Sequence, residues 1–131
     1  MEFSHVSLTY RGAGGESLSD INFRAEKGQI IGVIGGTGSG KSSLVNLIPR
    51  FYDATRGEIR IFGAGIKEYE PDSLRSHIGV VPQKAVLFKG TIRENLRWGN
   101  EDATEEELEE ALCLSQAKEF VDAKAELLDF Q

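Results

Sequence analysis

The feature that most constrains this 131-residue chain is a glycine-rich stretch, Gly35 to Ser42, with the sequence GGTGSGKS. Glycines leave backbone N–H groups clear of side chains, so that successive amides can surround an oxygen-rich anion. The stretch matches G-x-x-x-x-G-K-[ST], in which the lysine reaches the β and γ phosphates of a nucleotide and the final hydroxyl ligates Mg²⁺. The pattern therefore predicts phosphate binding by Gly35, Gly36, Thr37, Gly38, Ser39, Gly40, Lys41 and Ser42.

The residues on either side of this loop support the prediction. Residues 29–34 read Gln-Ile-Ile-Gly-Val-Ile, an apolar, β-branched run typical of a buried parallel strand. After the loop, four apolar residues recur on one face of a predicted helix: Leu44, Leu47, Ile48 and Phe51. Such a helix would direct its unpaired N–H groups at the phosphates, and Pro49 should end it because proline has no N–H. A chance match to the loop pattern is expected about one time in a hundred in a chain this long.

Composition narrows the class of protein. Hydrophobic residues make up 40% and charged residues 27%, which indicates a globular chain. The single cysteine, Cys113, excludes an internal disulfide and a cysteine-rich metal site, and we expect it to be a semi-buried helix residue. No run approaches the roughly 18 apolar residues of a membrane span, and no signal-peptide pattern opens the sequence, so a cytosolic location is the default prediction.

Charge is distributed unevenly along the chain. Residues 1–100 carry 13 Lys and Arg against 10 Asp and Glu, whereas residues 101–131 carry 2 against 11, so that the total is −6. The acidic C-terminal part argues against a general nucleic-acid-binding protein. Its simplest interpretation is a solvated helix face.

The remaining pattern predicts strands, helices and their caps. We expect an antiparallel strand at 2–10, further strands at 17–25 and 58–62, and a second buried strand at 78–82. Helices are expected at 72–76, 91–98, 104 onward and 115–121. Asp72, Thr91, Thr104 and Ser115 are the predicted helix caps, and Thr104 forms a capping box with Glu107. We expect Leu108, Ala111, Leu112 and Trp98 to be buried, and His5 and His77 to lie at the surface.

Several stretches, taken in order, resemble the nucleotide-binding domain of ABC transporters, and most closely those of exporters. They are Tyr10, the glycine loop, Val80 to Gln83, and Leu87 to Leu96, which reads LFKGTIRENL. The resemblance implies an α/β P-loop NTPase fold, with a RecA-like core and an antiparallel β subdomain. Residues 1–98 would form the ATP-binding core with the P-loop and Q-loop, and residues 99–131 would begin the helical subdomain.

The resemblance also implies residue roles. Tyr10 would stack on adenine, an interaction worth about 1–3 kcal/mol for bases in single-stranded nucleic acids. Ser43 would contact the α-phosphate, and Lys41 would act on the β and γ phosphates. Gln83 would be the Q-loop glutamine, which ligates Mg²⁺ with Ser42 or orients the attacking water. Each role has a simpler structural alternative. Tyr10 would be a half-buried strand residue, Ser43 a serine in the first turn of a helix, and Gln83 an ordinary loop residue.

The partners implied are ATP or ADP with Mg²⁺, a second nucleotide-binding domain, and a transmembrane domain at the cytoplasmic face of a membrane. The loop 83–90 would face that transmembrane domain. Val86, Leu87 and Phe88 would then be partner contacts, or alternatively would fold back into the core. No nucleic-acid partner is implied.

Some motifs of this family are absent from the sequence. It has no Leu-Ser-Gly-Gly-Gln signature and no apolar run ending in Asp-Glu, to which Leu127-Leu128-Asp129 is only a weak match, and neither histidine fits the switch histidine. We therefore expect a domain truncated before the signature, inactive alone, whose two central strands would follow Gln131. The alternatives are a nucleotide-binding or interaction module without turnover, or a different P-loop enzyme such as a small-molecule kinase.

Overall fold

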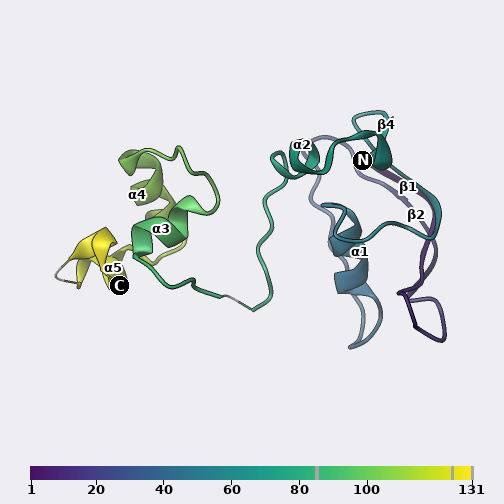
Figure 1. The fold of residues 1–131 in the computed structure, drawn as a ribbon, viewed down its shortest axis with the longest axis horizontal. Coiled ribbons are helices and arrows are strands. Elements are labelled where there is room, and N and C mark those ends of the chain that lie inside the picture. Colours follow the sequence, from purple (N-terminus) through teal and green to yellow (C-terminus); the bar gives the residue numbers. More distant parts are fainter. Residues whose placement is uncertain (85, 125, 131) are drawn as a thin grey trace. The chain divides into compact units, whose positions relative to one another are not determined.

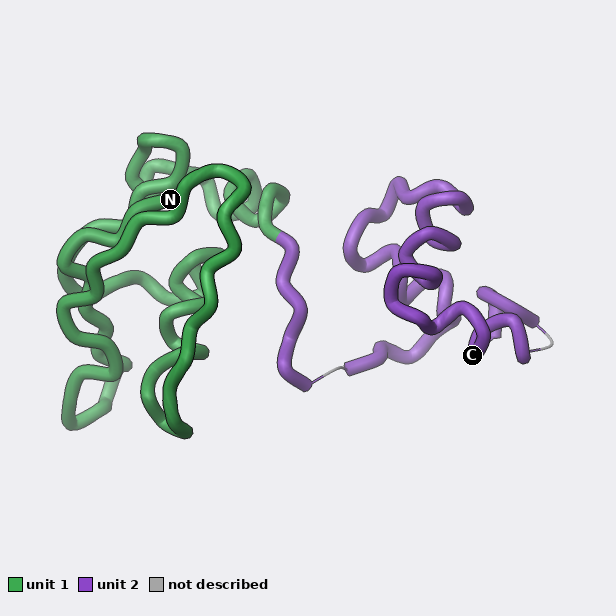
Figure 2. The backbone as a smooth tube through the Cα atoms, turned by 180° about the vertical axis from the view of Figure 1, so that it is seen from behind, with its two compact units in different colours: residues 1–78 green, residues 79–131 purple. Residues whose placement is uncertain are grey.

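The computed structural model describes residues 1–84, 86–124 and 126–130 (Figure 1). The chain divides into two compact units, residues 1–78 and 79–131, coloured separately in Figure 2. Unit 1 contains a β-sheet with short helices, whereas the regular elements described in unit 2 are all helical. Within the described residues, no helix combines the length and the apolar character that a bilayer crossing demands.

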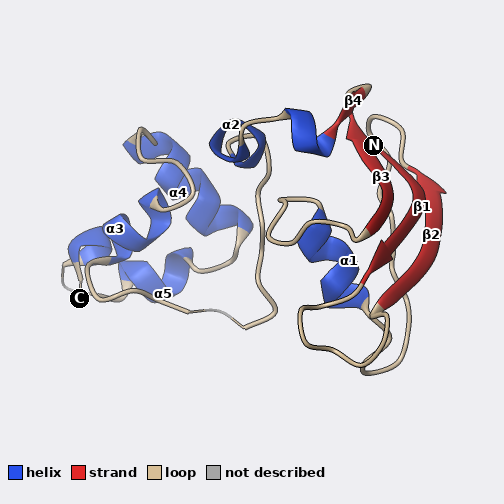
Figure 3. Cartoon of the chain, turned by 45° about the vertical axis from the view of Figure 1, so that its right-hand side comes forward, coloured by secondary structure: helices blue, strands red, loops and turns tan. Residues whose placement is uncertain are grey.

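Unit 1 is built on a four-stranded antiparallel sheet with the order β2-β1-β3-β4, shown in red in Figure 3. Its strands are β1 (Glu2–Leu8), β2 (Leu18–Arg24), β3 (Arg56–Ile61) and the two-residue β4 (Ala64–Gly65). In β1, Phe3 pairs with Phe23 on one side and Ile59 on the other, and the two phenylalanine rings stack 4.5 Å apart. The three predicted strands are therefore confirmed with somewhat different bounds, and all three pair in antiparallel fashion.

Helix α1 (Lys41–Leu47) packs against this sheet through Leu47, which is fully buried. The helix stops just before the buried Pro49, as predicted. Strands, helices and turns share one core: Phe3, Val6, Leu8, Leu18, Leu47, Ile59, Ile66 and Leu74. The sheet and the helix that follows the glycine loop are thereby held together by apolar burial.

A short 3₁₀ turn, η1 (Ile66–Glu68), and helix α2 (Pro71–Arg75) complete unit 1. Arg75 donates hydrogen bonds to the carbonyls of Pro49 and Arg50, each at 3.1 Å, which ties α2 to the end of α1. Asp72 lies in the first turn of α2, and Glu70 takes the cap position. The predicted Asp72 cap is therefore wrong, because Pro71 already occupies the favoured first position of the helix.

Unit 2 consists of α3 (Ile92–Arg97), α4 (Glu105–Leu114), α5 (Lys118–Asp122) and the 3₁₀ turn η2 (Leu127–Asp129). Its core residues are Ala103, Leu108, Leu112, Val121 and Leu128. Thr91 and Thr104 accept hydrogen bonds from the backbone N–H of Glu94 and Glu107, each closing a capping box. The two predicted threonine caps are therefore confirmed.

Four details predicted for unit 2 are wrong. Helix α5 begins at Lys118 with Ala117 as its cap, two residues later than a cap at Ser115 would place it. Ala111 and Cys113 are exposed, because the buried stripe of α4 is narrow and consists of Leu108 and Leu112. Trp98 is 68% exposed and stacks on Phe88 instead of entering the core.

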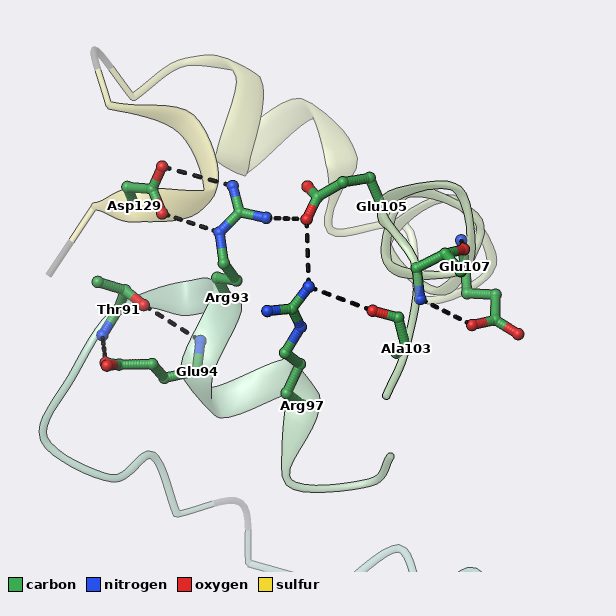
Figure 4. A network of polar contacts seen from close by, with 9 residues as sticks. Thr91, Arg93, Glu94, Arg97, Ala103, Glu105, Glu107 and Asp129 are labelled. Carbon is green, nitrogen blue, oxygen red and sulfur yellow. Dashed lines mark hydrogen bonds and ion pairs between the residues drawn. The ribbon is translucent and has the colours of Figure 1, made fainter. Parts of the chain in front are cut away.

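An ion-pair network joins the helices of unit 2 (Figure 4). Arg93 donates to Glu105 and to Asp129, the latter at 2.9 Å, while Arg97 donates to Glu105 and to the carbonyl of Ala103. Hydrogen bonding to Arg93 lowers the pKa of Asp129. Asp129, the acidic residue of the weak Leu-Leu-Asp match, is thus engaged in holding η2 to α3.

The two predicted buried parallel strands are not formed. Residues 29–34 and 78–82 have no strand assignment, and Ile30, Ile34 and Val81 are each at least 96% exposed. Neither segment pairs with another strand among the described residues. A parallel strand obtains its backbone hydrogen bonds only from neighbours, so an apolar run without them stays irregular. Of the predicted P-loop fold, this structure contains the antiparallel part and not the parallel core.

Candidate nucleotide-binding site

The glycine loop joins the extended residues 29–34 to α1, and its backbone requires glycine at two positions. Gly38 and Gly40 have φ angles of 79° and 86°, in the left-handed region that side chains disfavour. At Gly35, a Cβ atom would lie 2.5 Å from the Ser39 hydroxyl oxygen, because the loop folds back on itself. Glycine is thus favoured by backbone conformation at Gly38 and Gly40, whereas a side chain at Gly35 would require the Ser39 hydroxyl to rotate away.

Gly40 also anchors the loop to the sheet. A Cβ atom at this position would lie 2.7 Å from the Ser17 carbonyl oxygen and 2.8 Å from a methyl group of Leu18. Leu18 is a buried core residue at the first position of β2. Gly40, the N-cap of α1, is therefore in close contact with the beginning of β2.

The Lys41 ammonium group lies among the atoms of its own loop. It donates to the carbonyl oxygens of Gly35 and Gly36 at 2.7 and 2.6 Å, and to the Ser39 hydroxyl at 3.3 Å. These contacts use all three donors of an ammonium group. An anion bound in the loop would meet this charge directly and could replace the carbonyl acceptors, so the residues present fit a phosphate group.

Tyr10 lies close to the beginning of α1. Its hydroxyl donates a 2.9 Å hydrogen bond to the Ser43 hydroxyl oxygen, in a partly buried position. The Tyr10 ring also meets the Tyr52 ring in a T-shaped contact, with the centroids 4.9 Å apart. The structure thereby brings together two of the predicted nucleotide contacts, although they are 33 residues apart in sequence.

Tyr52 is the residue near this site that the sequence analysis missed. It follows the Pro49 stop of α1, in a stretch where Phe51 contacts the Arg75 guanidinium and Tyr52 contacts Tyr10. Two adjacent aromatic residues immediately after a helix that begins at a phosphate loop were the available signal. The surrounding sequence pattern did not indicate that Tyr52 would contact Tyr10, which follows β1.

The two predicted metal ligands lie in different units. Ser42 is an exposed second residue of α1 in unit 1, and Gln83 is an exposed residue of unit 2. No group of three or more His, Cys, Asp or Glu side chains suited to a metal occurs in the described part of the chain. Mg²⁺ is commonly bound through few protein ligands together with phosphate oxygens. The Ser42 hydroxyl and the Gln83 amide oxygen are compatible with such coordination. The ligand assignment itself stays a prediction.

The predicted partner loop 83–90 includes Ala85, which lies outside the described residues. Of its other apolar residues, Val86 is 63%, Leu87 83% and Phe88 50% exposed. Asn95 of α3 holds Phe88 by accepting from its N–H at 2.7 Å and donating to its carbonyl at 3.0 Å. These side chains are thus presented outward rather than folded into the core of unit 2.

Comparison with known proteins identifies the family. The ABC transporter family profile matches residues 18–128, which is most of the chain. This chain belongs to the ABC transporter family. It is 44% identical over 121 residues to a Staphylococcus aureus protein named "Putative multidrug export ATP-binding/permease protein", and equally to YgaD of Bacillus subtilis, which carries the same description. Each match covers 92% of this chain and 21% of the relative, so the chain spans about a fifth of those proteins.

The ABC transporter match includes the whole glycine loop and Gln83 but begins after Tyr10. Membership in this family makes nucleotide binding through a P-loop the expected use of residues 35–42. The role of Tyr10 rests separately on its hydrogen bond to Ser43 and on its half-buried ring.

The Gly40 contact gives a prediction for the stability of unit 1. Gly40→Ala should lower its free energy of unfolding by about 2 kcal/mol, because a left-handed alanine is strained and its Cβ would clash with β2. Urea denaturation followed by circular dichroism measures this change. Gly36→Ala is the matched control, since no atom lies within 4 Å of a Cβ there. Equal stability of the two variants would show that the loop is not anchored at Gly40.

Proposed function

We propose that this chain is the ATP-binding portion of an exporter-type ABC transporter ATPase domain. The observation that carries the proposal is the Lys41 ammonium group enclosed by the glycine loop, in a chain whose family is established. The relatives named as multidrug export ATP-binding/permease proteins support the exporter type. In the whole protein, ATP binding and hydrolysis would drive export across a membrane.

Each predicted contact has a defined task. The loop amides and Lys41 bind the β and γ phosphates, Ser43 contacts the α-phosphate, and Tyr10 stacks on adenine. Ser42 and Gln83 are the side chains that would hold Mg²⁺, which neutralises phosphate charge when bound. Lys41 stabilises the charge on the phosphoryl group as it passes to water, and Gln83 orients that water. Catalysis on this scheme consists of positioning and electrostatic stabilisation.

The remaining parts of the chain have proposed partners. The exposed loop 83–90 contacts the transmembrane domain at the cytoplasmic face, and a second nucleotide-binding domain completes the ATP site. Residues 1–98 then act as the ATP-binding core and 99–131 as the beginning of the helical subdomain. The apolar segments 29–34 and 78–82 carry exposed side chains and unpaired backbone groups, which favour association with other strands. In the whole protein, these segments would pair with neighbouring strands.

Replacement of Lys41 tests nucleotide binding. Lys41→Ala should weaken Mg-ATP binding by about 10- to 100-fold, because a charged hydrogen-bonding partner of the phosphates is lost. Isothermal titration calorimetry on folded protein measures the change. Lys27→Ala, which removes the same charge from an exposed turn of unit 1, is the control and should bind ATP as the parent chain does. Equal affinity of the Lys41 and Lys27 variants would refute the assignment of the loop.

A second test separates ATP binding from turnover. Asp129 is paired with Arg93, and the sequence has no apolar run ending in Asp-Glu, which favours a module without turnover for the 131 residues alone. We expect residues 1–131 to bind Mg-ATP but to release phosphate no faster than the buffer does. The complete exporter should release phosphate under the same conditions. Comparable turnover by a monomeric 131-residue chain would show that the catalytic set is misassigned.

A further inference from the structure

The side chain of Tyr10, which precedes the glycine loop, is held at two points that both follow the loop in the sequence. Its hydroxyl donates to the Ser43 hydroxyl oxygen at 2.9 Å, and its ring packs against Tyr52 at 4.9 Å between centroids. Ser43 is the third residue of α1, whereas Tyr52 follows the end of that helix. A single aromatic side chain thus contacts both the first turn of α1 and the segment that follows the helix.

A phenol hydroxyl is a stronger hydrogen-bond donor than an aliphatic hydroxyl, so Tyr10 donates to Ser43 in this 2.9 Å contact. A serine hydroxyl has one donor and two acceptor positions, and Tyr10 thus uses one of the acceptors. The Ser43 hydrogen therefore stays available to donate. Donation from Tyr10 also polarises the Ser43 O–H group and makes it a better donor, since hydrogen bonds in a chain reinforce one another. Without this contact, a serine in a helix can turn its hydroxyl to a backbone carbonyl of the preceding turn.

We propose that the Tyr10 hydroxyl is a positioning group, which orients the Ser43 hydroxyl to donate to the α-phosphate of a bound nucleotide. The inference rests on the proposed function, in which Ser43 contacts that phosphate and the Tyr10 ring stacks on the base. Tyr10 then contributes to nucleotide binding twice, through its ring to adenine and through its hydroxyl to the phosphate. Recognition of the base and of the α-phosphate is thereby coupled through one side chain.

A merely structural role for this hydrogen bond predicts something different. If the bond only held the end of β1 to α1, its removal would lower the stability of unit 1 and would weaken the binding of every ligand to a similar degree. A positioning role affects ligands that carry an α-phosphate and spares those that lack one. The ratio of ATP affinity to adenosine affinity separates the two, because adenosine has the base and no phosphate.

The experiment is a double-mutant cycle on Tyr10→Phe and Ser43→Ala, with both affinities measured by displacement of a fluorescent ATP analogue. Tyr10→Phe should lower the ATP-to-adenosine affinity ratio by about fivefold, the effect of one hydrogen bond. Ser43→Ala should lower it at least as much. The double variant should show no further loss, since Tyr10 acts through Ser43. Ser43→Thr keeps a hydroxyl and should keep the dependence on Tyr10.

Tyr69→Phe is the matched control. The Tyr69 hydroxyl donates to the Ile61 carbonyl at 2.8 Å in the same unit, so its removal deletes a comparable bond away from the loop. This variant should change thermal stability without changing the affinity ratio. The proposal is overturned if Tyr10→Phe leaves the ratio unchanged, or if its effect persists in full when Ser43 is alanine. Failure of the proposed function is distinct from these outcomes, because ATP affinity would then not depend on Lys41.

Discussion

The close contact between Gly40 and the beginning of β2 is the constraint on which the geometry of the site depends. Leu18 fills the space that a side chain at Gly40 would need, and it pairs with Leu8 across the β1–β2 ladder. Tyr10 follows Leu8 by two residues, so the pairing of β1 with β2 also determines the position of the Tyr10 backbone. The contact thereby links the end of the glycine loop, the start of α1 and the aromatic residue beside Ser43.

Hydrogen bonds around the loop add to this constraint. Lys41 is held by carbonyls of its own loop, while Ser43 is held by Tyr10 from the sheet side. Carbonyl groups of the loop thus fix the Lys41 ammonium group, and Tyr10 fixes the Ser43 hydroxyl. All of these hydrogen bonds lie within unit 1 and do not depend on pairing of the segments 29–34 and 78–82.

Features with a local cause were predictable from sequence. The loop follows from its glycine and lysine spacing, the stop after α1 from Pro49, and the caps at Thr91 and Thr104 from the acidic residues three positions later. The antiparallel strands follow from their alternation of apolar and polar residues, although β1 pairs with β3 across the glycine loop and α1. The family was also identified from sequence, since its motifs occur in order.

Features set by distant contacts were not predictable. Residues 29–34 have the composition of a buried strand, yet burial needs neighbours that the pattern alone does not supply. Trp98 is predicted to lie in the core, but it stacks on Phe88 at the surface. The Tyr10–Ser43 bond and the Tyr52 contact join residues that no periodicity connects.

Binding of Mg-ATP in the loop 35–42 of unit 1 is the proposal on which the other assignments depend. The most direct measurement is a titration of the ¹⁵N-labelled chain with Mg-ATP, followed through backbone amide chemical shifts and compared with a titration with MgCl₂ alone. The largest ATP-dependent shifts should occur at residues 36–43 and at Tyr10. Shifts confined to other residues, with the loop amides unchanged at saturating ATP, would contradict it.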